Sequence, residues 1–274
     1  MKSVKVAYAN IPNVGDLLNK YIIEKCFNVE VEHTSNYLKA DVVGIGSSLG
    51  LYQKAKDFKH IVKQMLMGKG NPWVWGTGFM YSESNHEPRF WEPMHFAAVR
   101  GKLSLERVEK IINQKLDIPV CDGGILTSYL LDNKISSKRY EVGVIPHYKE
   151  QDEPAFKKIS DSFPNSILIN LRKDPLTVIQ EISQCEYILS SSLHGLIMAD
   201  SFNIPNMHIF VSNKMMGDGF KFADYYSAFD LKDDYWDIKK GIPDKNDIID
   251  NYRILSKDVD RKKQEMMECF PYKE

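Results

Sequence analysis

The stretch YILSSSLHGLIMAD, residues 187–200, joins a short apolar run to a serine-rich turn and a second apolar segment. Residues 187–189 suit a buried strand, and the spacing of Leu196, Ile197 and Ala199 is typical of a helix packed on a sheet. A strand, turn and helix in this order leave unpaired backbone N–H groups at the helix start, where aligned peptide dipoles favour an anion. The stretch therefore predicts a strand–turn–helix unit of an α/β protein with an anion-binding turn.

The polar side chains of this turn have two interpretations. Three consecutive serines offer hydroxyl donors to a bound anion, and His194 offers a proton that exchanges near neutral pH. Alternatively, the serines only cap the helix and His194 is a structural histidine with its hydrogen bonds satisfied. Taken alone, the local residues favour neither interpretation.

Apolar runs that suit buried strands alternate with helix-like segments along the whole chain. Strands are expected at residues 4–9, 41–46, 73–78 and 97–101 in the first half, and at 141–147, 166–171, 187–190 and 205–210 in the second. Because the alternation occurs twice, it predicts an α/β fold with two Rossmann-like, doubly wound domains. We expect these domains to face a cleft lined by the C-terminal ends of both sheets, in a glycosyltransferase-B-like arrangement.

The polar stretch of residues 132–140 is the best candidate for a linker between the two domains. It gives an N-terminal domain at residues 1–135 and a C-terminal domain at residues 136–274. Asp122-Gly123-Gly124 is expected to close the first domain, and residues 214–226 to form a loop with partly buried aromatic side chains. The amphipathic tail from about residue 257 predicts a last helix that packs back on the first domain.

Composition limits the partners of the chain. It contains 36 Lys and Arg against 37 Asp and Glu, a formal net charge of −1, so no overall field attracts nucleic acid or an anionic membrane. We expect no nucleic-acid partner, and any bound anion must be held by a local cluster of residues.

Cysteine spacing and hydropathy indicate the compartment. The four cysteines stand singly, without a pair at metal-ligand spacing, so we expect neither a zinc site nor disulfides. The sequence shows no signal peptide and no run long enough to span a bilayer. These features predict a cytoplasmic protein without a metal, and they are compatible with peripheral contact to a membrane-borne substrate at the inner face of the membrane.

The serine-rich turn is part of a longer pattern. It reads SSLHG at residues 191–195 and is followed by an apolar helix and Ile204-Pro205. This order resembles the signature of the polysaccharide pyruvyl transferases, most of all the bacterial exopolysaccharide branch of the succinoglycan type. The resemblance extends from the NVGD segment at residues 13–16 to the GFKF segment at residues 219–222, and the order and spacing of these motifs carry it.

The resemblance implies a transferase that moves the pyruvyl unit of phosphoenolpyruvate onto two hydroxyls of a sugar, which forms a cyclic ketal. Its partners would be phosphoenolpyruvate, as donor substrate, and a saccharide or lipid-linked oligosaccharide acceptor, with no cofactor. The carboxylate and phosphate of the donor must be held by cations or N–H groups. Because the methylene carbon must gain a proton, a general acid with a pKa near the working pH is also required.

The same resemblance implies roles for individual residues. His194 would be the general acid, or would contact the phosphate or the methylene group. The donor, on the side of the C-terminal domain, would be bound by Ser191, Ser192, Leu193, Gly195, Arg100, Arg172 and Lys221. The acceptor, on the side of the N-terminal domain, would be bound by Asn13, Gly15 and Asp16, which are expected at the mouth of a parallel sheet.

One position departs from the family pattern. Many relatives carry arginine directly before Leu-His-Gly, where this chain has Ser192. Arg172 follows a strand that we expect to neighbour the strand ending at Ser190, so we predict that Arg172 supplies the missing cation. Arg100 and Lys221 are the alternative sources of charge.

Two other functions fit the same residues. One is a glycosyltransferase of the same architecture, because a nucleotide-sugar also presents phosphate to a helix N-terminus and fold alone does not fix function. The other is a non-catalytic carbohydrate-binding protein. The cleft-facing polar residues argue against the second, since a scaffold does not need them.

Overall fold

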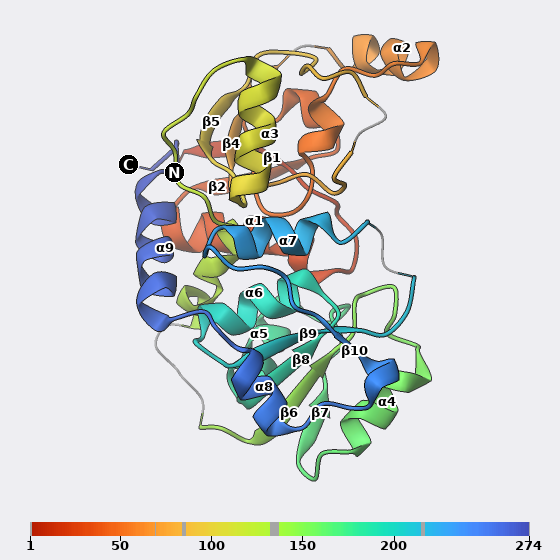
Figure 1. The fold of residues 1–274 in the computed structure, drawn as a ribbon. Helices are drawn as coiled ribbons and strands as arrows, with labels where there is room; N and C mark the ends of the chain where they lie inside the picture. The colour runs from red at the N-terminus through yellow and green to blue at the C-terminus, as the bar shows by residue number, and fades with distance from the viewer. Residues whose placement is uncertain (1, 69, 84–85, 132–136, 215–216, 274) are drawn as a thin grey trace.

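The computed structural model describes residues 2–68, 70–83, 86–131, 137–214 and 217–273 (Figure 1). The strands form two parallel five-stranded sheets, with the orders β2-β1-β3-β4-β5 and β10-β9-β8-β6-β7. Counted from the first strand of its own half, each sheet has the doubly wound order 2-1-3-4-5, in which the winding direction reverses beside the first strand. The predicted α/β class with parallel sheets is confirmed.

The first sheet is built from mostly short, buried strands. Its members are β1 (Ser3–Ala7), β2 (Glu30–Thr34), β3 (Val42–Val43), β4 (Trp73–Trp75) and β5 (His95–Ala98). The sequence did not predict β2, an edge strand that pairs only with β1 and alternates exposed glutamates with the buried Val31. The helices of this half are α1 (Val14–Phe27), α2 (Phe58–Met67) and α3 (Lys102–Ile112), with shorter 3₁₀ segments η1 (Tyr37–Lys39), η2 (Leu49–Tyr52) and η3 (Gly123–Leu131).

The second sheet repeats this plan. Its strands are β6 (Tyr140–Ile145), β7 (Ser166–Leu168), β8 (Cys185–Ser190), β9 (Asn206–Phe210) and β10 (Trp236–Asp237). Its helices are α4 (Pro154–Asp161), α5 (Pro175–Ser183), α6 (Leu193–Ser201), α7 (Phe220–Ser227), α8 (Lys245–Asn251) and α9 (Ser256–Glu268), with the 3₁₀ segment η4 (Ile238–Lys240). The predicted strand–turn–helix unit is β8 followed by α6.

Two expectations about the second half are wrong. The strand before Arg172 does not neighbour β8, because β6 pairs with both β7 and β8 and lies between them. The expected loop at residues 214–226 contains helix α7. Its Gly and Lys content suggested a loop, but Phe222 and Tyr225 stand three residues apart and are both buried, as a helix packed on the core requires.

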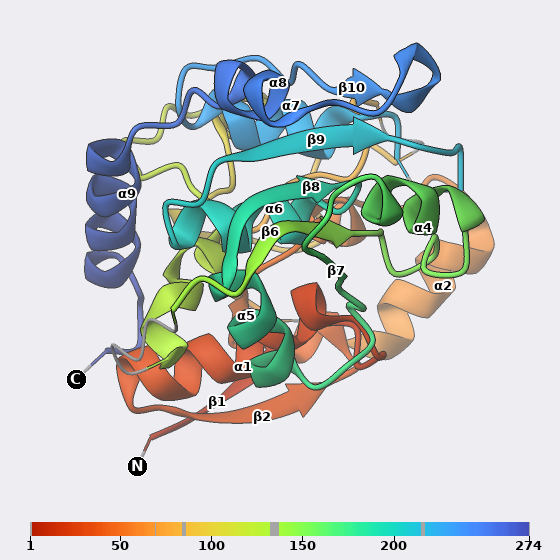
Figure 2. The same ribbon diagram turned by 90° about the horizontal axis from the view of Figure 1, so that it is seen from below.

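Both halves contribute to one hydrophobic cluster. It contains Val6 and Leu18 from the first half together with Ile145 and Leu196 from the second. Figure 2 shows α1 and α5 lying between the two sheets, and the N–H of Val14 donates to the carbonyl of Leu171 at 3.0 Å. The expected boundary between residues 135 and 136 lies outside the described residues.

Helix α9 runs along one side of the molecule from the second sheet towards the first (Figure 1). The indole Nε1 of Trp75 donates to the carbonyl of Met266 at 3.1 Å, and the ring of Phe270 stacks on Phe27 with centroids 4.0 Å apart. The end of the chain thus packs on the first half. Among the helices of the described residues, none has the length and apolar character needed to cross a membrane.

Candidate active site

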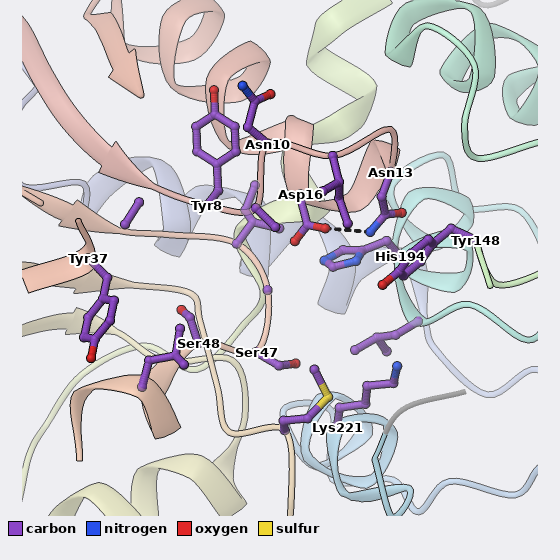
Figure 3. A pocket seen from close by; sticks show the side chains of 18 of the residues that line it. Tyr8, Asn10, Asn13, Asp16, Tyr37, Ser47, Ser48, Tyr148, His194 and Lys221 are labelled. Carbon is purple, nitrogen blue, oxygen red and sulfur yellow. Dashed lines mark hydrogen bonds between the residues drawn. The ribbon is translucent and has the colours of Figure 1, made fainter. Parts of the chain in front are cut away.

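A cavity of about 780 Å³ opens between the two sheets, within the size range of ligand sites. Its walls come from the segments after β1 and β3 in the first half and after β6 and β8 in the second. These are the points where each sheet reverses its winding direction, which is where doubly wound proteins bind ligands. The lining includes Tyr8, Asn10, Asn13, Asp16, Gly46, Ser47, His147, Tyr148, Ser192, Leu193, His194 and Lys221 (Figure 3).

His194 lies in the first turn of α6, with 14% of its side chain exposed. Its Nε2 atom is 4.0 Å from Oδ2 of Asp122, a fully buried carboxyl. Neither atom has a hydrogen-bond partner among the described residues, whereas Oδ1 of Asp122 accepts from the N–H of Gly124 at 2.8 Å. Two buried polar atoms that lack hydrogen-bond partners in the described part of the chain therefore lie 4.0 Å apart, beyond hydrogen-bonding distance.

Burial sets the protonation of this pair. It lowers the pKa of His194 to about 3, and the cations Lys221 and Arg100 act in the same direction. Burial also raises the pKa of Asp122 to about 7. At neutral pH, therefore, the imidazole is uncharged, whereas the nearby carboxyl keeps its proton to a far higher pH than an exposed aspartate does.

Asp122 is not among the site residues predicted from the sequence, where Asp122-Gly123-Gly124 is expected to close the first domain. The one available signal was an acidic residue directly after the apolar Val120-Cys121. Asp122 and His194 are far apart in the sequence, so only the fold brings them together.

Gly15 permits the close approach of α1 to His194. A Cβ atom at residue 15 would lie 2.2 Å from Nδ1 of His194, a distance that real side chains do not show. The structure therefore requires a glycine at residue 15, the position expected at the acceptor side, because a side chain there would clash with His194.

Asn13 and Asp16 stand beside the imidazole (Figure 3). Nδ2 of Asn13 donates to Oδ2 of Asp16 at 2.7 Å, and both side chains line the cavity. Burial raises the pKa of Asp16, although the hydrogen bond from Asn13 and the charge of Lys221 oppose this effect. The backbone N–H of Asn13 is held by the carbonyl of Ile11, which fixes the turn before α1.

Lys221 is a buried cation without a carboxylate partner among the described residues. Only 7% of the residue is exposed, and its Nζ lies over the ring of Phe222, 5.2 Å from the centroid, but makes no hydrogen bond or ion pair with any described residue. Burial and the charge of Arg100 lower its pKa to about 8. Figure 3 shows Lys221 reaching into the opening from the side opposite Asp16.

The start of α6 adds unpaired donors to the same wall. Ser192 caps the helix by position but makes no capping hydrogen bond through its side chain. The N–H groups of Leu193, His194 and Gly195 donate to none of the described residues. Together with Lys221, they make this part of the cavity suited to an anion.

Arg100 lies behind the cavity wall and is fully buried. Its Nε donates to Asp224 at 2.9 Å, Nη1 to Gly46 O and Ser47 Oγ, and Nη2 to Phe79 O. These bonds tie α7, which carries Lys221, to the loops of the first sheet. Arg100 is not among the residues that line the cavity.

Arg172 lies outside the cavity, at a partly exposed position. Its Nε and Nη2 donate to the carbonyl of Tyr148, and Nη1 is 3.3 Å from the exposed carboxylate of Asp152. The structure therefore does not bring Arg172 to the loop of Ser192, since β6 separates the two strands.

The remaining motif residues divide between the cavity and the framework. Ser192 and Leu193 line the cavity, whereas Oγ of Ser191 donates to the buried Glu150 at 2.7 Å. Gly195 serves packing, because a Cβ there would lie 2.4 Å from Oγ of Ser190.

His147 lines the cavity and is not among the site residues predicted from the sequence, although it is the last residue of the expected strand at 141–147. Burial lowers its pKa to about 3, with contributions from Lys221 and Lys149. Its backbone N–H donates to Oγ of Ser191 at 2.9 Å, so the ends of β6 and β8 are joined beside the site.

Comparison with known proteins agrees with the motif. Residues 4–213 match the family described as polysaccharide pyruvyl transferase. The succinoglycan biosynthesis protein ExoV of Rhizobium meliloti is 26% identical over 154 residues, 56% of this chain and 46% of its own length. An uncharacterised protein of Acanthamoeba polyphaga mimivirus is 28% identical over 231 residues, 82% of this chain and 73% of its own length.

Two solved structures resemble the chain at lower similarity. An uncharacterised Klebsiella pneumoniae protein gives a TM-score of 0.46 at 16% identity and covers 86% of this chain and 93% of its own. The ADP-heptose heptosyltransferase II of Escherichia coli gives a TM-score of 0.33 at 13% identity, and the match covers 98% of this chain and 99% of that protein. The family match spans most of the residues that form both sheets and the cavity between them. The chain therefore belongs to the polysaccharide pyruvyl transferase family.

Proposed function

We propose that the protein transfers the pyruvyl group of phosphoenolpyruvate to a sugar of a surface polysaccharide or exopolysaccharide precursor and forms a cyclic ketal. Family membership supports a transferase of polysaccharide biosynthesis. The observation that carries the proposal is that His194, backed by Asp122, shares one cavity wall with the unpaired Lys221 and the uncapped start of α6.

In this proposal the donor is held at the start of α6. Phosphoenolpyruvate carries a phosphate and a carboxylate, and a desolvated anion requires cations or N–H donors around it. The free N–H groups of residues 193–195 and the ammonium of Lys221 supply these donors. Since His194 belongs to the same helical turn, an anion bound there places the donor next to the imidazole. Arg100 acts indirectly in this scheme, by holding α7 and hence Lys221 in place.

The bound anion would also change the protonation of His194. Without it, burial above all, and then the charges of Lys221 and Arg100, lower the pKa of the imidazole. In this proposal a donor anion offsets the two charges and interacts directly with the imidazole, which raises the pKa of His194 so that the proton held by Asp122 can move to Nε2. The carboxylate left behind stabilises the imidazolium, which is then the acid for the methylene carbon. Asp122 thus acts through His194 as a positioning and proton-holding residue.

The proposed transfer forms one C–H bond and two C–O bonds on the pyruvyl unit. A C–H bond forms at the methylene carbon with the proton from His194, and a sugar hydroxyl forms a C–O bond to the neighbouring carbon. The bond from that carbon to the phosphate oxygen then breaks, and the second hydroxyl forms the second C–O bond. Two O–H bonds are broken in total: one proton restores the Asp122–His194 pair and the other leaves with inorganic phosphate.

The acceptor would lie on the first-sheet side of the cavity. Asp16, held by Asn13, presents a carboxylate that can accept a hydrogen bond from a sugar hydroxyl next to His194. Tyr8 and Tyr37 line the cavity further out and provide aromatic surface for a sugar ring. In this scheme the two sheets with their helices act as domains at residues 1–135 and 136–274 in a glycosyltransferase-B-like arrangement.

A thermal-shift titration tests the donor. Phosphoenolpyruvate should raise the melting temperature in proportion to the logarithm of its concentration above Kd, whereas a panel of nucleotide-sugars should not. Inorganic phosphate should then be released when saccharide acceptors are added. Selective stabilisation by a nucleotide-sugar would show a glycosyltransferase instead. Binding of saccharides without any donor binding would show a carbohydrate-binding protein.

A further inference from the structure

Helix α2 exposes its apolar side chains. Phe58 and Leu66 are 81% and 84% exposed, and Met65 is 64% exposed. The buried residue of this helix is the polar Gln64. A surface helix of a globular protein normally buries its apolar stripe and exposes its polar residues, so α2 is oriented the opposite way.

The apolar residues of α2 other than Met67, which packs against the core beside Leu38 and Tyr52, form one continuous face. With 3.6 residues per turn, Phe58, Ile61, Val62, Met65 and Leu66 fall within an arc of about 140°. Gln64 points away from this arc. An apolar stripe of this width is what a helix ordinarily packs against a hydrophobic partner.

Hydrogen bonds, together with the apolar contact of Met67 at its end, hold α2 on the protein. Nε2 of Gln64 donates to Gln53 O at 2.9 Å, and its Oε1 accepts from Ala55 N at 3.1 Å. Asp57 caps the helix by accepting from His60 N at 3.0 Å. Because these polar contacts position the helix, its apolar face stays available to a partner.

Lysines border this face. Lys59 and Lys63 project next to Leu66 on the helical wheel, Lys56 precedes the helix, and all three are exposed. The chain as a whole carries a net charge of −1, so this positive charge is a local feature. Exposed Phe and Leu bordered by lysines are typical of helices that lie in the interface of an anionic bilayer, where the lysine stems extend to the headgroups. Lysine is depleted in the interfaces between proteins, which favours lipid over a protein partner.

We propose that α2 binds the surface of an anionic lipid bilayer, with its apolar face in the interface and its lysines at the lipid phosphates. Figure 1 shows α2 projecting from the end of the first-sheet half, where a flat surface can reach it. Membrane binding of this kind does not depend on the chemistry proposed above.

The position of α2 also bears on the acceptor. Its end is tied to the cavity wall, because Nδ2 of Asn36 donates to Met67 O at 2.8 Å and the next residue, Tyr37, lines the cavity. Its start follows η2, whose exposed Leu51 lines the same cavity. A bilayer that contacts α2 therefore lies near the first-sheet side of the cavity. This part of the inference rests on the proposed function and identifies the acceptor as a lipid-linked saccharide.

Vesicle sedimentation tests the docking. The full chain should sediment with vesicles of equal parts phosphatidylcholine and phosphatidylglycerol, and much less with phosphatidylcholine alone. Phe58→Ser with Leu66→Ser should abolish the difference, and each of Lys59→Gln and Lys63→Gln should lower partitioning about fivefold. Ile249→Ser, which removes an exposed apolar residue from α8, is the matched control and should bind as the unchanged chain does. The four side chains substituted in α2 are all exposed. The melting temperatures of these variants should therefore equal that of the unchanged chain.

Three outcomes would overturn the proposal: no sedimentation of the unchanged chain with the anionic vesicles, equal binding by the α2 variants, or a shift of the α2 variants from dimer to monomer in light scattering. The last result would assign the apolar face to a second copy of the chain. Vesicle binding without any stabilisation by phosphoenolpyruvate would leave the docking intact and refute the proposed donor. Phosphoenolpyruvate binding without vesicle binding would support the proposed donor and refute the docking of α2.

Discussion

Gly15 and His194 touch across the two halves of the chain: a Cβ on Gly15 would stand 2.2 Å from Nδ1 of His194. The start of α1 and the start of α6 therefore meet at the point where the candidate acid is held. Since the contact leaves no space for a methyl group, it fixes how closely the two helices approach.

Gly15→Ala should displace His194 or the first turn of α1. A misplacement of about 1 Å at a reacting group costs on the order of 10²-fold in rate, so turnover should fall by about that factor. Steady-state kinetics would measure it. Gly50→Ala is the matched control, because a Cβ at Gly50 meets nothing within 4 Å. Equal activity of both variants would show that the contact has no role in positioning the imidazole.

His194→Gln removes the titrating imidazole and keeps a hydrogen-bonding side chain of similar length. If His194 is the general acid, turnover should fall by roughly 10²- to 10⁴-fold. Phosphate release would be followed at a fixed pH, with the melting temperature as the control for folding. A variant with near-normal turnover and an unchanged melting temperature would make His194 a structural histidine.

Asp122→Asn keeps the shape of the side chain but cannot hold or release a proton. In the unchanged protein the pKa of Asp122 is about 7, so the rate should decline as the pH rises through that region and the shared proton is lost. In the variant this limb of the kcat/KM profile should disappear, at a lower overall rate. A profile that keeps the same limb would assign it to another group.

Asp122→Asn should lower the reaction rate but raise the stability of the folded protein. Folded Asp122 keeps its proton up to about pH 7, whereas the unfolded chain loses it near the ordinary carboxyl value. The folded state therefore binds more protons in this window, and the free energy of unfolding falls as the pH rises. Asp122→Asn should raise the melting temperature more at about pH 8 than at about pH 5. Asp250→Asn, on an exposed face of α8, should change it little at either pH.

Lys221→Met should weaken donor binding and stabilise the empty protein, because the ammonium is buried without an ion-pair partner among the described residues. We expect a loss of roughly 2–5 kcal/mol in binding of phosphoenolpyruvate, measured by calorimetry. Arg172→Ala is the informative comparison, since Arg172 contacts Tyr148 and Asp152 outside the cavity. If Arg172→Ala weakens donor binding and Lys221→Met does not, the prediction made for Arg172 from the sequence stands and ours for Lys221 is wrong.

Local patterns were sufficient for much of the fold. The apolar runs that became β4, β6, β8 and β9 were recognisable because a buried parallel strand is apolar on both faces, whereas β1 alternates the exposed Lys5 with the buried Val4 and Val6. Edge strand β2 lacks that signal, since only one of its faces is covered. Helix α7 was missed because the glycines before it resemble a loop.

The site was recognisable only where a motif is continuous in sequence. Residues 191–195 are compatible with an anion site by themselves, and the resemblance to the family assigns both this motif and Lys221 to the donor. The pairing of Asp122 with His194 depends on how η3 packs against α6, and strand order placed Arg172 elsewhere. Neither relationship is encoded in local spacing.

The packing of Phe270 on Phe27 and Trp75 has a consequence for synthesis on the ribosome. The first half cannot complete this part of its core until residue 270 has left the exit tunnel, by which time the second half has already emerged. Until then Phe27 and Trp75 lack their aromatic partner, and a nascent chain should expose them to chaperones. Final closure of the first half is thus a late event of translation, although its residues are made first.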